Sequence, residues 1–151
     1  RVDVAHDIIR ELSVHAVVEE QVLYPGTRRR TGGEQLVDHA VEEHDRLKQV
    51  LADLDGASPA DDRFLAGFRL ARQLVEDHVA EEESTLLPRL AAETPADELE
   101  KMGRAMEAAK KISPTRPHPH SPSSPPGNIV VGPVVAVVDK VRDAVRDALS
   151  K

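Results

Sequence analysis

The chain has 151 residues, 20 Lys and Arg against 27 Asp and Glu, a net charge of −7 and no cysteine. This composition excludes disulfides, thiolate metal sites and cysteine nucleophiles, and the acidic balance argues against a nucleic-acid surface. No apolar run reaches the ~18 residues of a membrane helix and no signal peptide opens the chain. We therefore expect a cytoplasmic, helical protein that binds neither nucleic acid nor membrane.

Apolar residues recur at helical spacing through the first three quarters of the chain, which predicts an all-α fold. Breaker and capping residues divide this pattern into four helices. The predicted ranges are about 2–23, ending at Tyr24-Pro25-Gly26; 34–55, ending at Gly56; 59–90, beginning at Ser58-Pro59 and ended or kinked by Pro88; and 95–112, after Thr94-Pro95. An antiparallel helical bundle over residues 1–112 is therefore expected.

The composition changes after residue 112. Residues 113–133 contain seven of the eleven prolines, together with Ser and Gly, which predicts an extended linker or strap. Residues 134–151 read as a C-terminal amphipathic helix. The charges of this helix alternate in sign, whereas a membrane-binding helix would be basic, so we expect it to pack on protein.

Three of the predicted helices carry histidine or glutamate on their core-facing stripes, where leucine is expected. These stripes are Ile8, Leu12, His15, Glu19 and Val22; Val37, Ala40, His44, Leu47, Leu51 and Leu54; and Phe64, Phe68, Ala71, Val75, His78, Glu82 and Thr85. His15-x3-Glu19-x5-Pro25 is repeated as His78-x3-Glu82-x5-Pro88. Two of the predicted helices therefore share one spacing of histidine, glutamate and proline.

The glutamates decide between a metal site and an ordinary core. A lone histidine on an apolar face is usually a satisfied core residue, but a buried carboxylate without a partner costs several kcal/mol. No Arg or Lys is expected on these stripes to neutralise the carboxylates. Three imidazoles and two carboxylates without sulfur suit iron, manganese or zinc. A metal site is therefore preferred to a structural hydrogen-bond network.

The chain resembles the hemerythrin-like (HHE cation-binding) family over about residues 2–112. The resemblance rests on three stretches, His15 to Pro25, Glu43-His44 and His78 to Pro88. The resemblance implies a four-helix bundle around a non-haem, usually di-iron, site. It also implies that the ligands are His15, Glu19, His44, His78 and Glu82, with the two glutamates as bridges. The implied function is handling or sensing of O2, peroxide or nitric oxide. The alternatives are a peroxide-decomposing, catalase-like di-iron enzyme and a metal-poor helical module that binds other proteins.

The family pattern opens with a further helix, whose histidine supplies another ligand, and this chain shows no such helix upstream of His15. His6 precedes His15 by nine residues, ~13.5 Å along one helix, so the two cannot share an ion. We expect His6 at the surface or at the end of the bundle. The missing helix is absent, trimmed or disordered. If it is absent, the helix over 134–151 or a partner chain, as in a homodimer, could fill the vacant position.

Several further residues are expected to lie beside the ligands and to hydrogen-bond to them. These are Tyr24, His39 and Glu43. The alternative for Tyr24 is packing at the helix end, and the alternative for His39 and Glu43 is a place on the solvated surface. Glu20 or Glu83 could substitute for one of the ligand glutamates. His118 lies in the proline-rich strap and is expected to be a simple linker residue.

Overall fold

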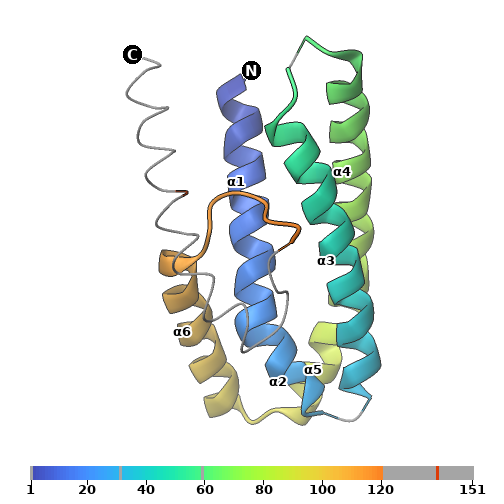
Figure 1. The fold of residues 1–151 in the computed structure, drawn as a ribbon. Coiled ribbons are helices and arrows are strands. Elements are labelled where there is room, and N and C mark those ends of the chain that lie inside the picture. Colours follow the sequence, from blue (N-terminus) through green and yellow to red (C-terminus); the bar gives the residue numbers. More distant parts are fainter. Residues whose placement is uncertain (1, 31, 59, 121–138, 140–151) are drawn as a thin grey trace.

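The computed structural model describes residues 2–30, 32–58, 60–120 and 139 of the chain. Figure 1 shows that consecutive long helices run in opposite directions. The elements in chain order are α1 (Val2–Val18), the π-helical turn η1 (Glu19–Leu23), α2 (Tyr24–Arg28), α3 (Gly33–Asp55), α4 (Asp62–Glu81), the π-helical turn η2 (Glu82–Leu86), α5 (Leu87–Glu93) and α6 (Ala96–Ile112). The predicted all-α, antiparallel bundle is confirmed.

Apolar clusters lie on both sides of a polar layer in the middle of the bundle. One cluster comprises Leu23, Tyr24, Val37, Ala40, Leu86 and Leu90. The other comprises Ile9, Leu47, Leu51, Leu54 and Ala71. On α3, His44 lies between Ala40 of the first cluster and Leu47 of the second. The polar layer is therefore bounded along the bundle by buried apolar side chains.

The helix α6 packs on the side of α1 that faces away from α4 (Figure 1). Ala109 is buried in a third cluster with Val14 and Val18 of α1, and Met106 packs against that cluster. Leu99 packs against the cluster that contains Leu23 and Tyr24. The apolar side of this helix thus packs on the bundle.

The buried face of α1 is rotated by about one residue from the predicted stripe. Ile8 was expected in the core but is 41% exposed, whereas Ile9 is 2% exposed. The rotation brings Glu20 inward, where its carboxylate pairs with Lys48 of α3 at 2.7 Å. The spacing of apolar residues along one helix does not reveal this rotation, because the rotation also depends on the ion pair between Glu20 and Lys48 of a different helix.

Two prolines expected to end or disturb helices do not end them. The first helical segment continues through Tyr24-Pro25-Gly26 as η1 and α2, up to Arg28. The third predicted helix continues past Pro88 as α5, up to Glu93. The prediction of a helix end at residues 24–26 was therefore wrong, for a reason that the site geometry explains below.

The start of α4 lies three residues later than predicted. Asp61 has an extended backbone (φ −79°, ψ 132°) and its side chain accepts the backbone N–H of Arg63 at 2.9 Å. An N-terminal aspartate of this kind satisfies one of the free N–H groups at a helix start. Pro59, the expected first residue, lies outside the described residues.

Glycines shape the turn between α2 and α3. Gly32 has a left-handed backbone (φ 65°), which residues with a Cβ rarely adopt. A Cβ on Gly33 would lie 1.9 Å from the carbonyl oxygen of Thr27, so the close contact of this turn requires glycine. The turn directs α3 back along α1 and so brings His44 level with Glu19.

The described part of the proline-rich strap, residues 113–120, contains no helix or strand. Arg116 Nη1 contacts Asp55 Oδ2 at 2.6 Å, which ties the strap to the end of α3. Figure 1 shows the strap crossing α1 toward α3.

Asp139 is buried and accepts the backbone N–H groups of Thr115 and Arg116 at 3.1 and 3.0 Å. His118 Nε2 lies 2.9 Å from the same carboxylate. His118 was expected to be a simple linker residue, but it takes part in this anchor. Apart from Asp139, the predicted helix over 134–151 lies outside the described residues, as do residues 121–133. Among the residues that the structure describes, no helix is long and apolar enough to span a membrane.

Candidate metal centre

Both glutamates of the repeated spacing begin a π-helical turn, Glu19 in η1 and Glu82 in η2. In each turn the glutamate carbonyl accepts the N–H of the residue five positions later. Pro25 or Pro88 follows that residue. Proline cannot donate to the carbonyl four residues back, and its ring clashes with that carbonyl. The wider turn avoids both problems, so the shared spacing produces the same local structure twice.

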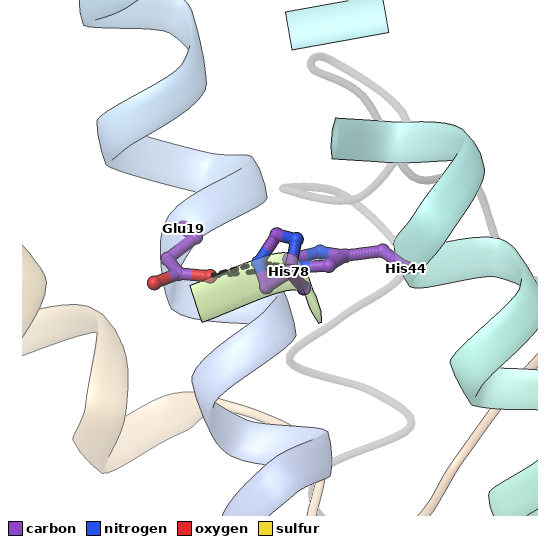
Figure 2. A group of neighbouring side chains, drawn as sticks. All are labelled: Glu19, His44 and His78. Carbon is purple, nitrogen blue, oxygen red and sulfur yellow. Dashed lines mark hydrogen bonds and ion pairs between the residues drawn. The ribbon is translucent and has the colours of Figure 1, made fainter. Parts of the chain in front are cut away.

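Three buried side chains from different parts of the bundle converge in the polar layer (Figure 2). Glu19 comes from η1, His44 from α3 and His78 from α4. Glu19 Oε2 lies 3.3 Å from His44 Nε2 and 3.9 Å from His78 Nε2. The two Nε2 atoms are 3.1 Å apart. One ligand atom from each residue therefore lies within 4.8 Å of the other two, close enough to share an ion.

Each buried histidine is held from behind by a carboxylate. His44 Nδ1 lies 3.0 Å from Glu20 Oε1, and His78 Nδ1 lies 2.8 Å from Glu43 Oε2. Since an ionised carboxylate only accepts hydrogen bonds, these contacts place a proton on each Nδ1. The Nε2 atoms are left to face Glu19. Metal-binding histidines are commonly oriented by such a carboxylate.

Lys48 was missed by the sequence analysis, which expected no buried cation on the stripes. Lys48 is 6% exposed, and its Nζ lies 2.7 and 2.8 Å from the two oxygens of Glu20. This expectation was therefore wrong. The cation pairs with Glu20, the carboxylate that holds His44, and not with Glu19 or Glu82, the two glutamates whose burial the sequence left unexplained. Lys48 follows His44 by one helical turn, so a sequence signal existed.

Tyr24 also belongs to the polar layer, where it contacts Glu82 and His44. Its hydroxyl donates to Glu82 Oε1 at 3.2 Å and lies 3.0 Å from His44 Nε2. Glu82 Oε1 also lies 3.4 Å from His78 Nε2. Tyr24 is 2% exposed, so its hydroxyl has little access to water. The tyrosine is thus positioned beside the atoms that would hold an ion.

His15 lies at the edge of the centre and its side chain is 52% exposed. Its Nε2 is 3.1 Å from Glu19 Oε1, the carboxylate oxygen that points away from His44. His15, Glu19 and Glu82 form a second group whose ligand atoms lie within 4.8 Å of one another. The structure therefore brings all five predicted ligands together, four of them buried and His15 exposed.

The surrounding carboxylates raise the pKa values of both buried histidines. Burial lowers the pKa of His78, but its contacts with Glu19 and Glu43 outweigh burial and raise the pKa to about 9. Burial likewise opposes the charged form of His44, and Glu19 and Glu20 raise its pKa above the ordinary value. The polar layer therefore favours positive charge on the two imidazoles.

The acidic groups of the layer respond in opposite directions. Burial raises the pKa of Glu19, but His44 and His78 more than compensate and bring it down to about 2. Burial and the charge of Glu19 raise the pKa of Glu82. Burial, followed by the charges of Glu19 and Glu82, raises the pKa of the Tyr24 hydroxyl. Of these two glutamates, Glu19 is therefore the one that more strongly favours its charged form.

One buried atom tests whether the residues fit a metal ion. Glu19 Oε2 is buried and accepts no hydrogen bond, although His44 Nε2 and His78 Nε2 lie near it. The Nδ1–H groups of both rings already point at other carboxylates. When the rings are neutral, three atoms with available lone pairs thus face one another in a buried space. A cation satisfies all three at once, so the residues fit a metal ion.

The remaining predicted residues lie around this core. Glu43 contacts His78 and so lies beside a predicted ligand, whereas His39 lies on the exposed side of Glu43. Glu83 is exposed, away from the convergent atoms. His6 is partly exposed near the start of α1.

Comparison with known proteins places the chain in a family. Residues 1–90 match the family described as hemerythrin HHE cation binding domain. The match covers more than half of the chain, and the chain therefore belongs to the hemerythrin HHE cation-binding family. This confirms the resemblance inferred from the sequence. Domains of this family bind metal cations, typically iron, and the buried cluster of histidine and glutamate is consistent with that.

Two curated relatives show how far the similarity extends. The chain is 29% identical over 140 residues to an uncharacterized hemerythrin-like protein of Schizosaccharomyces pombe, covering 91% of this chain and 69% of the relative. It is 32% identical over 103 residues to a DNA nickase of Nostoc sp., covering 68% of this chain and 29% of that protein. No solved structure is significantly similar.

Proposed function

We propose that the chain binds two iron ions in this centre and handles or senses O2, peroxide or nitric oxide. The observation that carries the proposal is that two groups of ligand atoms share Glu19. Glu19 Oε2 faces His44 and His78, while Glu19 Oε1 faces His15. A carboxylate can bridge two ions ~3.5–4 Å apart. The shared glutamate therefore favours a pair of ions, with manganese or zinc as the alternative metals.

The protein would hold the ions through Glu19, His44 and His78 on one side and through Glu19, His15 and Glu82 on the other. Bound iron would supply open coordination positions and redox chemistry for small oxygen or nitrogen ligands. The apolar clusters on both sides of the layer limit the access of water. The chain itself thus binds the ions, orients their ligands and shields them from water.

Tyr24 supports a role for the centre in binding a small polar molecule. Its hydroxyl is held by Glu82 and lies beside His44 Nε2. Because the pKa of Tyr24 is raised, the hydroxyl keeps its proton at neutral pH and acts as a hydrogen-bond donor. If it turned from Glu82 toward a ligand beside His44, the same O–H would stabilise negative charge on that ligand.

Access from solvent is open on the side of His15. A cleft of about 420 Å³ lies between α1 and α6, lined by Leu12, His15, Val18 and Met106 among others. Small, weakly polar molecules such as O2 or nitric oxide would pass these side chains more readily than large substrates. The nickase activity of the Nostoc relative is not extended to this chain, which spans 29% of that protein and has a net charge of −7.

The test is metal analysis of the full chain after expression in iron-supplemented medium. Iron, manganese and zinc are measured per chain, together with the near-ultraviolet absorption spectrum. We expect about two irons in the unaltered chain and a loss of at least one in Glu82→Gln. Glu83→Gln changes the next residue, which is exposed, and serves as the matched control. Circular dichroism verifies that both variants keep their helices.

Each outcome has a distinct meaning. Iron in both variants but none lost in Glu82→Gln would contradict the assignment of that ligand. An unaltered chain that takes up no metal and melts at the same temperature with or without iron would favour a protein-binding module. For the iron-loaded chain, spectral change on adding O2 or nitric oxide without turnover indicates a carrier or sensor. Sustained peroxide consumption, lost in His78→Ala, indicates a catalase-like enzyme.

Sedimentation velocity of the same preparations determines whether the proposed small-ligand protein is a monomer or a homodimer. A homodimer that dissociates when iron is removed would link assembly to the centre.

A further inference from the structure

A third group of candidate ligands lies on the outside of the bundle, where α3 and α4 pack together. His39 and Glu43 are one turn apart on α3, and Glu81 is the last residue of α4. His39 Nε2 lies 3.1 Å from Glu81 Oε2 and 3.5 Å from Glu43 Oε1. The side chain of His39 is 53% exposed. One imidazole and two carboxylates therefore converge at the surface.

Glu43 connects this outer group to the buried centre. Its Oε1 lies near His39, while its Oε2 accepts the Nδ1–H of His78 at 2.8 Å. A cavity of about 10 Å³ lies at the same place, lined by His39, Glu43, Glu81 and Glu82 among others. That volume is roughly the space of one water molecule. The outer group and the centre thus adjoin one small gap between α3 and α4.

We propose that His39, Glu43 and Glu81 form a capture site for a divalent transition-metal cation, which holds the ion at the surface before it enters the buried centre. One nitrogen and several carboxylate oxygens suit Fe(II), Mn(II) and Zn(II). Three protein ligands leave coordination positions for water, which suits an ion that must be released again. The delivery role rests on the proposed metal centre, whereas the outer cation site does not.

The gap next to Glu82 supports delivery rather than a separate structural site. Glu82 belongs to the buried ligand group with His15 and Glu19, and it also lines the cavity behind the outer group. The next carboxylate that an ion meets on leaving the capture site is therefore Glu82, a ligand of the buried centre. The rearrangement it needs is local, because the gap lies between side chains of two neighbouring helices.

An ion-pair network is the competing explanation of the same contacts. A protonated His39 between two carboxylates would give similar distances, and exposed pairs of this kind contribute little to stability. The two explanations differ in the response of His39 to added metal. A capture site binds the cation through the His39 ring, whereas an ion pair leaves the ring without a metal contact.

The experiment follows each histidine ring of the full chain by ¹⁵N NMR during titration with Zn²⁺. A His39→Gln variant identifies the ring signals of His39. We expect His44 and His78 to respond to the first equivalents, and His39 to respond as a separate, weaker step. In the double variant His39→Gln/Glu81→Gln, calorimetry should show the affinity of that weaker step reduced by at least about 10-fold.

The matched control is Glu42→Gln/Glu83→Gln, which removes two exposed glutamates that neighbour Glu43 and Glu82. It removes more negative charge than the test variant and no proposed ligand. The weaker zinc step should survive in this control. Its loss in the control would show that general surface charge attracts zinc, and would overturn the site.

Delivery is measured by stopped-flow loading of the metal-free chain with Co²⁺, followed by the visible absorption of the bound ion. We expect loading of the buried centre to slow by about 10-fold in His39→Gln/Glu81→Gln, at the low end of electrostatic steering effects. The final stoichiometry of the buried centre should not change. An unchanged loading rate overturns the delivery role.

The NMR result separates this inference from the proposed function. A response of His44 and His78 with none from His39, up to millimolar zinc, overturns the capture site and leaves the centre in place. A response of His39 with none from His44 and His78 supports the outer cation site and contradicts the buried centre.

Discussion

Lys48 provides the sharpest test of how the polar layer is held together. Its ammonium contacts both oxygens of Glu20, at 2.7 and 2.8 Å, and the Glu20 carboxylate is 1% exposed. Lys48→Met keeps most of the aliphatic side chain but removes the charge. Breaking a buried pair from one side costs ~3–5 kcal/mol, because it leaves an uncompensated buried charge. Glu20 keeps its contact with His44, so we expect a loss of about 3 kcal/mol.

The assay is urea unfolding at pH 7 in the presence of a chelator, analysed by linear extrapolation. A loss of this size should lower Tm by roughly 6–12 °C in a chain of this length. Lys101→Met is the control, since Lys101 pairs with Asp97 on the exposed face of α6 and should cost less than about 1 kcal/mol.

The double variant Glu20→Gln/Lys48→Met separates a charge effect from a packing effect. Removal of both charges should restore part of the stability lost in Lys48→Met, because no ionised group is then left unpaired in the interior. The reasoning is refuted if Lys48→Met lowers the free energy of unfolding by no more than Lys101→Met. It is also refuted if the double variant loses more free energy of unfolding than Glu20→Gln and Lys48→Met lose together when measured singly.

Three further predictions concern stability in the presence of a chelator. Gly103→Ala should raise the free energy of unfolding by about 0.5–1 kcal/mol, since its Cβ meets nothing within 4 Å, whereas Gly33→Ala should lower it because its Cβ meets a carbonyl oxygen at 1.9 Å. Tyr24→Phe removes the hydroxyl that donates to Glu82 and should cost about 1–3 kcal/mol by urea unfolding. The pKa of His78 is raised from 6.5 to about 9, so its contribution to stability is complete below pH 6.5 and is lost as pH rises toward 9. Thermal melts between pH 6 and 9.5 should show this decline, and a His78→Gln variant should show less of it.

The helical bundle was predictable because its signals are local. Long apolar periods identified all four long helices, and each of them occurs in the structure. The error fell at Pro25, where a helix end was predicted but the helical segment continues to Arg28. At Pro88, where an end or a kink was predicted, the helix passes through the π-helical turn η2 and continues to Glu93. A proline prevents only the α-type bond to the carbonyl four residues back, and a π turn removes that conflict. The repeated spacing contained this information, since both prolines stand six residues after a glutamate.

The centre was predictable only within each helix. A His and a Glu one turn apart must share a face, so His78 and Glu82 could be paired from their spacing. The contacts of Tyr24 with Glu82 and of His78 with Glu43 join residues 58 and 35 positions apart. Such contacts depend on the rotation of one helix against another. Periodicity gives this rotation only to within about one residue, as the exchange of Ile8 for Ile9 in the core shows.

The pKa shifts and the ligand geometry both indicate that the polar layer favours positive charge beside its buried carboxylates. Without a metal, the carboxylates around His44 and His78 raise the pKa values of both rings, so protons supply the positive charge. The atoms that would hold a cation are Nε2 of these rings and Oε2 of Glu19, which accepts no hydrogen bond. Protons and metal therefore compete for the same nitrogen atoms. Displacement of ring protons by a divalent ion offsets part of the charge that the ion brings into the layer.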